Sequence, residues 1–237
     1  MKWILVVFAF FFCTVARAQV PGYMGKRLTI GYSNYFVLPA IGKITRTLDG
    51  KRVPSAYIAQ SVSLNYVVTV SKEITASVKY YNRKINAPIY SALDYSEIKH
   101  YEKLSCIEYS FGYRKFRKDK ISPVGNYVRW EGLFVSGRLN YDPYDTYTYS
   151  GSTGYVVSHQ SGGQVRFKGV GFAYSRGRQR IFSDKYVIDF GARGEGLIVY
   201  SSEGENEYAN QISRSISDAT TLEPRLSIYI GIGFLAF

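Results

Sequence analysis

The clearest pattern along the chain is an alternation of apolar and polar residues with a period of two, as in β-strands that have one apolar face. In 74–80, for example, Ile74, Val78 and Tyr80 alternate with threonine, serine and lysine. No stretch after residue 18 approaches the ~20 apolar residues that a transmembrane helix needs. The pattern therefore predicts eight strands, which lie at about 27–33, 58–69, 74–80, 107–113, 128–135, 164–176, 186–195 and 225–237.

Two of these segments are less regular than the others. Within 164–176 the apolar residues change phase near Gly169, and a β-bulge at that point would bring both halves onto one face. Within 225–237 both faces are apolar or glycine. The residues that change phase are Val165 and Phe167 before the glycine, and Val170, Phe172 and Tyr174 after it.

The segments between the predicted strands alternate in length. Up-and-down outer-membrane barrels show this arrangement, because short turns gather at the periplasmic end and long loops at the outer end. A soluble β-sandwich also has alternating strands, but it has no reason to sort its connections by length or to place Tyr, Phe and Trp on the same face of most strands. We therefore predict an all-β fold, a transmembrane up-and-down antiparallel β-barrel of eight strands with short periplasmic turns and long extracellular loops. The long segments are about 37–54, 84–101, 141–163 and 200–224, and the short ones lie near 71–73, 114–125 and 176–185.

The first 18 residues have the features of a secretory signal peptide. A lysine supplies the positive start, 3–12 is an unbroken apolar run, and Ala16 and Ala18 are small residues at the positions that a signal peptidase reads. The apolar run is too short for a transmembrane anchor. We expect cleavage of 1–18, so that 19–237 forms a single barrel domain with Cys106 as its one cysteine and no intrachain disulfide.

Composition narrows the class of partner. Aromatic residues make up 16% of the chain, and most of them are tyrosine. The formal net charge of +12 falls to +10 once Lys2 and Arg17 are removed with the signal peptide. A basic protein could bind nucleic acid, but an exported chain rarely meets any, so we expect no nucleic-acid partner. Outer-membrane lipid, including lipopolysaccharide, or another acidic envelope polymer is expected instead.

Some polar positions of the predicted strands carry charges that point into the barrel. Eight strands leave an interior just wide enough for side chains. A buried charge without a partner is costly, and both signs are present, so we expect a salt-bridge network that fills the interior. The alternative is that these charges mark a path for ions. The residues are Glu108, Arg129, Glu131, Asp189, Arg193 and Glu195.

Charge outside the strands differs between the two ends of the predicted barrel. The long segments together carry −3, so the outer loops lack the surplus of a strong binder of lipopolysaccharide phosphate. The short turns carry +7, from 114–120 and 176–185, which places the basic surplus on the periplasmic side. This rim could dock acidic phospholipid, cell-wall polymer or a periplasmic protein, or its charges could simply solvate the turns and the membrane edge. The rim residues are Arg114, Lys115, Arg117, Lys118, Lys120, Arg176, Arg178 and Arg180.

Candidate catalytic or metal-binding residues are few. The chain has two histidines, too few for a zinc site, and no glycine-rich phosphate loop between a strand and a helix. In "VVSHQSGG" (156–163), His159 and Ser161 resemble the His-x-Ser of outer-membrane lipid A deacylases, in which the histidine would activate the serine. Gly162 stands where that family has asparagine, and a solvated loop histidine is the simpler interpretation. We therefore expect no metal, no cofactor and no enzymatic activity, and solvation rather than cation binding by the loop carboxylates Asp142, Asp145, Glu203, Glu205 and Glu207.

In layout, 19–237 resembles the small eight-stranded outer-membrane β-barrel proteins of Bacteroidota. The stretch "YMGKRLTIGYSNYF" (23–36) is similar to a first strand of that group. The stretch "ISPVGNYVRWEG" (121–132) is similar to its turn, in which Pro-x-Gly-x-Tyr leads into a central strand. The resemblance implies residence in the outer membrane of a Gram-negative bacterium, and it does not imply a reaction.

The C-terminal strand carries a second part of this resemblance. Phe237, Leu235 and Tyr229 match the family's pattern of a final aromatic residue preceded by apolar residues at every second place, whereas two glycines depart from it. The resemblance implies that the barrel-assembly machinery recognises this strand. We also expect 225–237 to pair with the first strand near 28–32 and to close the barrel.

Three hypotheses for function remain. The first is a non-enzymatic integral barrel that serves as a structural or accessory subunit of a larger outer-membrane protein assembly, as some members of the resembled family do. The second is a lipid A-modifying enzyme that acts through His159 and Ser161. The third is a narrow pore.

Overall fold

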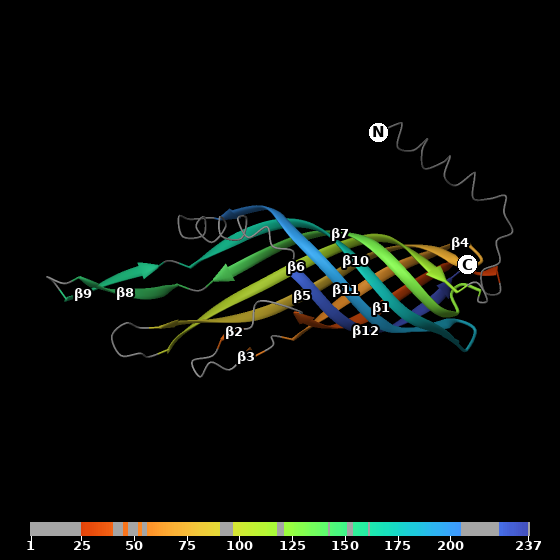
Figure 1. Cartoon of the computed structure of the whole chain (residues 1–237), viewed down its shortest axis with the longest axis horizontal. Helices are drawn as coiled ribbons and strands as arrows, with labels where there is room; N and C mark the ends of the chain where they lie inside the picture. Colours follow the sequence, from red (N-terminus) through yellow and green to blue (C-terminus); the bar gives the residue numbers. More distant parts are fainter. Residues whose placement is uncertain are drawn as a thin grey trace, which may run out of the picture.

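The strands form one closed barrel and two small hairpins (Figure 1). The computed structural model describes residues 25–39, 45–46, 52–53, 56–90, 97–117, 121–141, 143–150, 154–160, 162–204 and 223–236, and within these ranges it has twelve strands. The hairpins pair β2 (Thr45–Arg46) with β3 (Arg52–Val53), and β8 (Tyr144–Ser150) with β9 (Gly154–Gln160). The barrel strands are β1 (Leu28–Pro39), β4 (Tyr57–Thr69), β5 (Lys72–Tyr90), β6 (Glu97–Phe116), β7 (Gly125–Tyr141), β10 (Gly163–Phe182), β11 (Tyr186–Gly204) and β12 (Glu223–Ala236).

The barrel closes because its first strand pairs with its last. β1 runs antiparallel to β12, from Leu28 opposite Ala236 to Pro39 opposite Arg225, and its other edge pairs with β4. The order around the barrel is β1-β12-β11-β10-β7-β6-β5-β4, so each barrel strand lies beside the barrel strands that precede and follow it. A closed ladder of this kind pairs the backbone groups of all eight strands without leaving an edge. The predicted eight-stranded up-and-down barrel and its closure by the C-terminal strand are confirmed.

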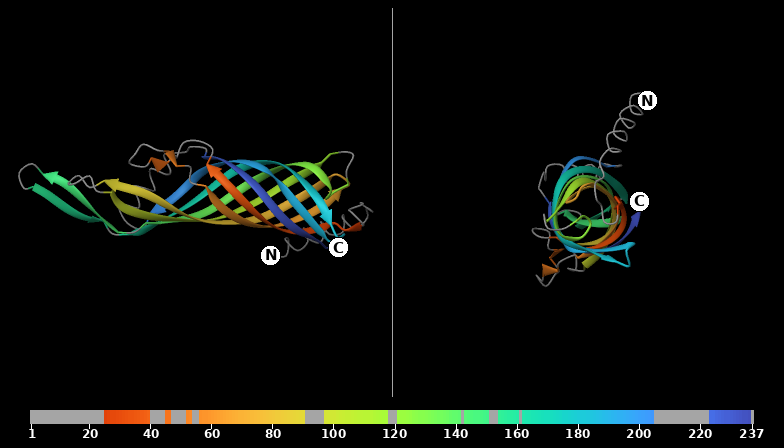
Figure 2. Two further views of the ribbon diagram at one scale, coloured as in Figure 1. Left: turned by 90° about the horizontal axis from the view of Figure 1, so that it is seen from below. Right: turned by 90° about the vertical axis from the view of Figure 1, so that its right-hand side faces the viewer.

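The two ends of the barrel differ, and we call them the turn end and the loop end. At the turn end, short connections join β4 to β5, β6 to β7 and β10 to β11. At the loop end, β5 from Asn82 onward pairs only with β6, and β6 before Glu102 pairs only with β5, up to Tyr90 opposite Glu97. The hairpin of β8 and β9 also projects beyond this end (Figures 1 and 2). The loop end therefore carries two ribbons that stand clear of the barrel.

Parts of the expected outer loops are strands. The segment 84–101 was expected as a loop, but β5 continues to Tyr90 and β6 begins at Glu97. The segment 141–163 likewise contains β8 and β9. In both segments antiparallel backbone pairing continues beyond the closed barrel, where the contrast between a barrel interior and an outer wall no longer imposes a strict alternation of side chains.

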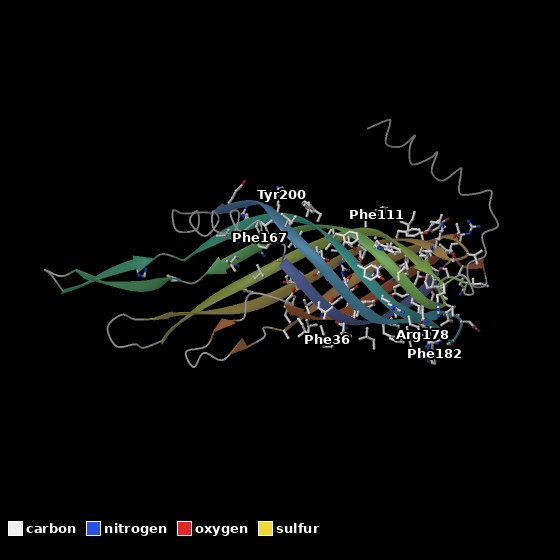
Figure 3. The ribbon with its side chains drawn as sticks, viewed as in Figure 1. Phe36, Phe111, Phe167, Arg178, Phe182 and Tyr200 are labelled. Atoms are coloured by element: carbon white, nitrogen blue, oxygen red, sulfur yellow. The ribbon has the colours of Figure 1, made fainter. Side chains whose placement is uncertain are left out.

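The side chains of the barrel are distributed with apolar groups outside and polar groups inside. Large apolar side chains lie exposed on the outer wall of every barrel strand (Figure 3), while serine, threonine and charged residues are buried within it. No described helix is long and apolar enough to cross a membrane. Examples of the outward apolar side chains, one from each barrel strand in turn, are Phe36, Ile58, Val78, Phe111, Phe134, Phe172, Phe190 and Ile228.

The expected bulge in β10 takes a different form from the one predicted. The pairing of β10 with β11 shifts between Lys168 and Gly169, but the unpaired extra residue is Tyr200 on β11. Val165 is fully buried, and Phe167 packs against the buried core. Both therefore face the interior, which is why they are out of phase with the outward-facing residues nearer the turn end.

Candidate functional site

The barrel interior contains all the charged side chains that are buried in the described part of the chain. Five are acidic and five are basic, so the buried charge sums to zero. They come from five of the eight strands, and each is at most 9% exposed. The ten residues are Glu73, Lys79, Glu108, Arg114, Arg129, Glu131, Asp189, Arg193, Glu195 and Arg225.

Arg193 is the centre of the larger of two clusters, which we call the Arg193 cluster. Its Nη2 lies 2.8 Å from Glu108 Oε1, its Nη1 lies 2.9 Å from Glu131 Oε2, and its Nε lies 2.9 Å from Glu195 Oε2. Lys79 bridges two of the same carboxylates, at 2.8 Å from Glu108 and 2.8 Å from Glu195. One guanidinium and one ammonium therefore hold carboxylates from three different strands.

Two further arginines complete the Arg193 cluster at its edges. Arg129 Nε lies 3.2 Å from Glu131 Oε2, and its guanidinium stands over the ring of Tyr229 with 5.6 Å to the ring centroid. Arg225 Nη1 lies 3.7 Å from Glu195 Oε1 and donates a hydrogen bond of 2.8 Å to the hydroxyl of Tyr81. Each carboxylate of the cluster thus has at least one cation beside it, as buried charges require.

A smaller cluster, the Arg114 cluster, lies nearer the turn end. Arg114 Nη1 lies 3.1 Å from Glu73 Oε2, and its Nη2 lies 3.3 Å from Asp189 Oδ2. Asp189 also accepts hydrogen bonds from the hydroxyl of Tyr127 at 2.6 Å and from the amide of Gln179 at 2.9 Å. The β6–β7 turn contributes Ser122, which is buried and donates a hydrogen bond to Glu73.

Aromatic rings join the two clusters. The hydroxyls of Tyr127 and Tyr229 form a hydrogen bond with each other. Tyr127 also binds Asp189, and the ring of Tyr229 lies under the guanidinium of Arg129, so this hydrogen bond connects the two clusters. Tyr35 packs against Tyr229 with 5.1 Å between ring centroids, and Lys79 stands 5.3 Å from the Tyr35 ring centroid. Charges and rings together fill this part of the interior, and the pairing of every carboxylate with a cation suits a structural plug.

The structure places the six interior charges expected from the sequence in this network, and it adds four that sequence reasoning missed. Lys79 lies on the polar side of its strand, so strand parity alone could have identified it. Glu73 and Arg225 lie at strand ends, where the alternation is too short to assign a face. Arg114 was expected in the periplasmic basic rim, but it is 1% exposed because β6 continues to Phe116 and its even-numbered residues face inward.

The other rim residues that the structure describes are exposed. Lys115 and Arg117 are exposed, whereas Lys118 and Lys120 lie outside the described residues. The remaining three, Arg176, Arg178 and Arg180, are exposed on β10, which continues to Phe182, and so they project from the wall rather than from the turn.

An aromatic row borders this basic part of the wall. Rings from β6, β7 and β10 lie side by side, with 6.4 Å between the centroids of Tyr113 and Trp130 and 5.9 Å between those of Trp130 and Tyr174. The next outward-facing residues toward the turn end are Lys115 on β6 and Arg176 on β10, both of them opposite Val128 of β7. Where a membrane meets water, the wall of a barrel typically carries a belt of aromatic side chains with cationic side chains on its watery side.

The expected assembly signal divides between described and undescribed residues. Tyr229 and Leu235 are buried, at 1% and 2% exposure, and therefore face the barrel interior. Phe237 lies outside the described residues. The outward face of β12 is formed by the alternate row, which is apolar throughout and consists of Leu226, Ile228, Ile230, Ile232 and Phe234.

The residues considered for catalysis or metal binding do not form a site in the described part of the chain. His159 is exposed on β9, where Asp145 of β8 is its partner across the hairpin, and Ser161 lies outside the described residues. Glu203 is exposed near the end of β11. Asp142, Glu205 and Glu207 also lie outside the described residues. Among the residues that can be searched, no group of three or more His, Cys, Asp or Glu side chains could hold a metal ion.

Comparison with known proteins gives only a likeness in structure. No family model matches the chain, and no curated protein sequence matches it. A major outer membrane protein from Thermus thermophilus is similar with 8% identity and a TM-score of 0.46, over 88% of this chain and 98% of that one. The Neisserial surface protein A matches with 11% identity and a TM-score of 0.43, over 88% and 97% of the two chains. Ail, the attachment invasion locus protein of Yersinia pestis, matches with 12% identity and a TM-score of 0.40, over 88% and 96%.

Proposed function

We propose that this chain is an integral outer-membrane β-barrel without enzymatic activity, which acts as a structural or accessory subunit of a larger envelope assembly. The observation that carries the proposal is an uncharged apolar band on the outer wall. On β6, every outward-facing side chain between Lys103 and Lys115 is uncharged, and the same holds on β10 between Lys168 and Arg176. The eleven intervening residues of β6 match the about 9–11 residues with which a tilted strand crosses a bilayer.

The location of the charges supports a membrane environment. Large apolar side chains exposed to water on every strand would make a soluble barrel associate, whereas in hydrocarbon they are the favoured surface. The interior reverses the pattern, because its ten charges are paired with one another and shielded by the wall. An exported chain with this arrangement is suited to the outer membrane, with the loop end outside and the turn end in the periplasm.

The packed interior supports a plug rather than a pore. Eight strands leave little room beyond their own side chains. Here the Arg193 and Arg114 clusters and the tyrosines between them occupy that room, and their net charge of zero gives no preference to a passing ion of either sign. We expect purified protein in planar bilayers to add no conductance above that of lipid alone.

The two ribbons at the loop end support an accessory role. The hairpin of β8 and β9 is a two-stranded sheet, so both of its outer edges are open to pairing with another chain. Its first strand is rich in tyrosine, at Tyr144, Tyr147 and Tyr149, a residue enriched in protein interfaces. We propose that a larger outer-membrane partner docks on this hairpin, and that the barrel-assembly machinery inserts the chain.

Two experiments test the two halves of the proposal separately. Heat-modifiable gel migration and recovery in the outer-membrane fraction test the barrel, and a soluble periplasmic product would contradict it. Gentle detergent extraction followed by affinity purification tests the accessory role, with a matched variant in which 144–160 is replaced by a short turn. We expect partners to co-purify with the full chain and to be lost from the variant. A lone monomer from the full chain would contradict the accessory role while leaving the barrel intact.

A further inference from the structure

Two amide side chains interrupt the apolar outer face of two neighbouring strands. Gln60 of β4 is exposed, and the residues before and after it on the same face are the exposed apolar Ile58 and Val62. Asn34 of β1 lies directly opposite Gln60 and is half-buried, with exposed aromatic residues on both sides of it along β1. Both amides therefore face outward within an apolar part of the wall.

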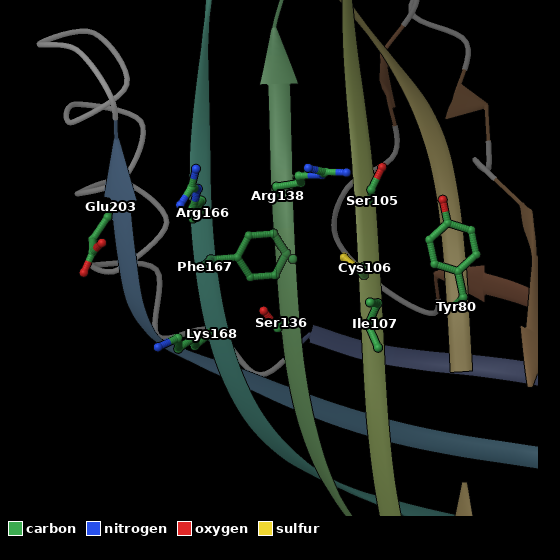
Figure 4. Close-up of a pocket in the computed structure, with 11 residues that line it drawn as sticks. Tyr80, Ser105, Cys106, Ile107, Ser136, Arg138, Arg166, Phe167, Lys168 and Glu203 are labelled. Carbon is green, nitrogen blue, oxygen red and sulfur yellow. The ribbon is translucent and has the colours of Figure 1, made fainter. Parts of the chain in front are cut away.

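The strand register shows at what depth of the apolar band these amides lie. A row of paired residues, one from each strand, runs around the barrel at right angles to the strands. Because the strands of a barrel are tilted against its axis, such a row changes height as it goes round. The row that starts on β10 at Lys168, the loop-end border of the band, returns to β10 at Arg178, beyond the turn-end border. Its members are in order Lys168, Ser136, Ile107 and Tyr80, all labelled in Figure 4, and then Gln60, Asn34, Ile230, Phe190 and Arg178.

Gln60 lies in the middle of this row and therefore near the middle of the band. It is the fourth residue after Lys168 and the fourth before Arg178. An even descent around the barrel places Gln60 level with the midpoint between these two cations on β10, which is next to Phe172. An amide at this depth of a bilayer is costly if it lacks a hydrogen-bond partner, because no water is present to take that role.

The side chain of Gln60 has no such partner in the described part of the chain. Asn34 differs, because its Oδ1 accepts a hydrogen bond of 3.3 Å from the hydroxyl of Tyr32. Lipid chains offer neither donors nor acceptors to an amide. A second primary amide offers both, so that two such groups can satisfy each other through a pair of N–H···O hydrogen bonds.

The wall around these amides carries no charge. The described outward side chains of β4, β1 and β12 are uncharged over 58–66, 28–38 and 226–234. The opposite wall, formed by β6, β7 and β10, carries exposed cations such as Lys115 and Arg176. Two copies of a basic protein that met through that wall would bring like charges together, whereas the uncharged wall brings none together. The wall that contains Gln60 therefore suits contact with a second copy of this chain.

Two copies inserted in the same orientation carry Gln60 at the same depth. A two-fold axis along the membrane normal can then place this residue against itself, in an isologous contact. The exposed side chains of Phe36, Ile58 and Val62 supply the apolar surface that packs around the pair.

We infer that this chain forms a symmetric dimer in the membrane through the wall of β4 and β1, in which the Gln60 amides of the two copies are hydrogen-bonded to each other. The inference rests on the proposed membrane location, since an unpaired amide is costly only away from water. It does not depend on the proposed accessory role, which concerns a different partner at the β8–β9 hairpin.

Energy transfer between donor- and acceptor-labelled barrels in lipid vesicles, measured as the protein is diluted with lipid, tests the dimer. We expect the full barrel to follow a monomer–dimer equilibrium. Gln60→Leu removes the amide while keeping the wall apolar, and it should shift this equilibrium at least about tenfold toward the monomer, because two hydrogen bonds are lost in each dimer. The matched control is Asn126→Leu, which removes an exposed amide from β7 on the opposite side of the barrel and should leave the equilibrium unchanged.

Disulfide trapping in outer-membrane preparations tests the location of the contact. In a Cys106→Ala background, oxidation of Gln60→Cys should give a disulfide-linked homodimer. Phe172→Cys should give none, because Phe172 lies at a similar depth on β10, across the barrel from β4.

Four outcomes would overturn the inference. They are energy transfer that stays at the level of monomers, unchanged dimerisation of Gln60→Leu, equal trapping at the two positions, and trapping of Gln60→Cys to a different protein. Heat-modifiable migration of each variant shows that the barrel is folded, so any of these results leaves the proposed membrane barrel standing.

Discussion

Arg193 of β11 and Glu131 of β7 form an ion pair of 2.9 Å across the barrel interior, although β10 separates their strands in the wall. The two strands lie two strand spacings apart, or about 10 Å, so long side chains that point into the barrel can meet over β10. Arg193 also binds two further carboxylates, so it neutralises more buried acid than any other residue of its cluster. The stability of the barrel should therefore depend strongly on this one guanidinium.

Arg193→Met is expected to destabilise the barrel by about 3–5 kcal/mol, because it leaves buried carboxylates without their central cation. Urea titration of the protein refolded in detergent, followed by heat-modifiable migration, measures the change. Adding Glu131→Gln restores the balance of charges and should recover part of the loss. Arg176→Met removes an exposed arginine from the outer wall and serves as the control, with little change expected.

A pair of glycines tests how closely the strands of the wall pack. A Cβ added at Gly112 would lie 2.1 Å from the backbone oxygen of Trp130, whereas one added at Gly132 meets nothing closer than 3.9 Å. We expect Gly112→Ala to cost about 1–3 kcal/mol, because the backbone cannot yield without disturbing the ladder. Gly132→Ala should be tolerated. Equal unfolding midpoints for the two variants in urea would contradict this account.

The barrel itself could be predicted from the sequence because each strand has one polar and one apolar face. A two-residue period fixes which residues share a face, and so Glu108, Arg129 and Arg193 could be assigned to the interior before any contact was known. Arg114 was misplaced because a basic run was taken as a turn, whereas strand β6 extends through the first part of that run. The odd or even position of a charged residue within its strand therefore predicts whether it faces the interior more reliably than the basic character of the residues around it.

The residues that meet across neighbouring strands could not be predicted in the same way. Arg138 and Arg166 belong to strands that are separated in the sequence by the β8–β9 hairpin, and their apposition depends on the register of β7 against β10. A two-residue period excludes a shift of one residue between the strands, but a shift of two keeps every side chain on its face, so periodicity alone does not say which residues meet. On each strand, the sequence shows only where the apolar alternation ends, and this point marks the border of the apolar band. It does not show which residues of two neighbouring strands lie side by side at that border.

The apolar band predicts a dependence of stability on position along β10. Phe172 lies midway between Lys168 and Arg176, and Phe182 lies at the turn end of the same strand, with both side chains facing outward. In lipid vesicles, Phe172→Arg should cost about 2–4 kcal/mol and Phe182→Arg about 0–1 kcal/mol, because a charge is tolerated near the interface and not near the middle of the bilayer. The measurement is urea unfolding in vesicles. Equal costs at the two positions would mean that the band does not mark the bilayer.

The C-terminal residue gives a last prediction, which separates assembly from folding energy. Ala236 is the final described residue to pair, opposite Leu28 of β1, so Phe237 adds no described contact to the closing ladder. Its resemblance to the terminal aromatic residue of outer-membrane barrels implies a signal for the assembly machinery. We expect deletion of Phe237 to lower the amount of protein in the outer membrane several-fold while leaving urea unfolding of the refolded protein nearly unchanged. Leu235→Ala is the matched comparison, since Leu235 is 2% exposed and its loss should lower the stability of the refolded barrel. Normal outer-membrane levels of the truncated chain would show that Phe237 carries no signal.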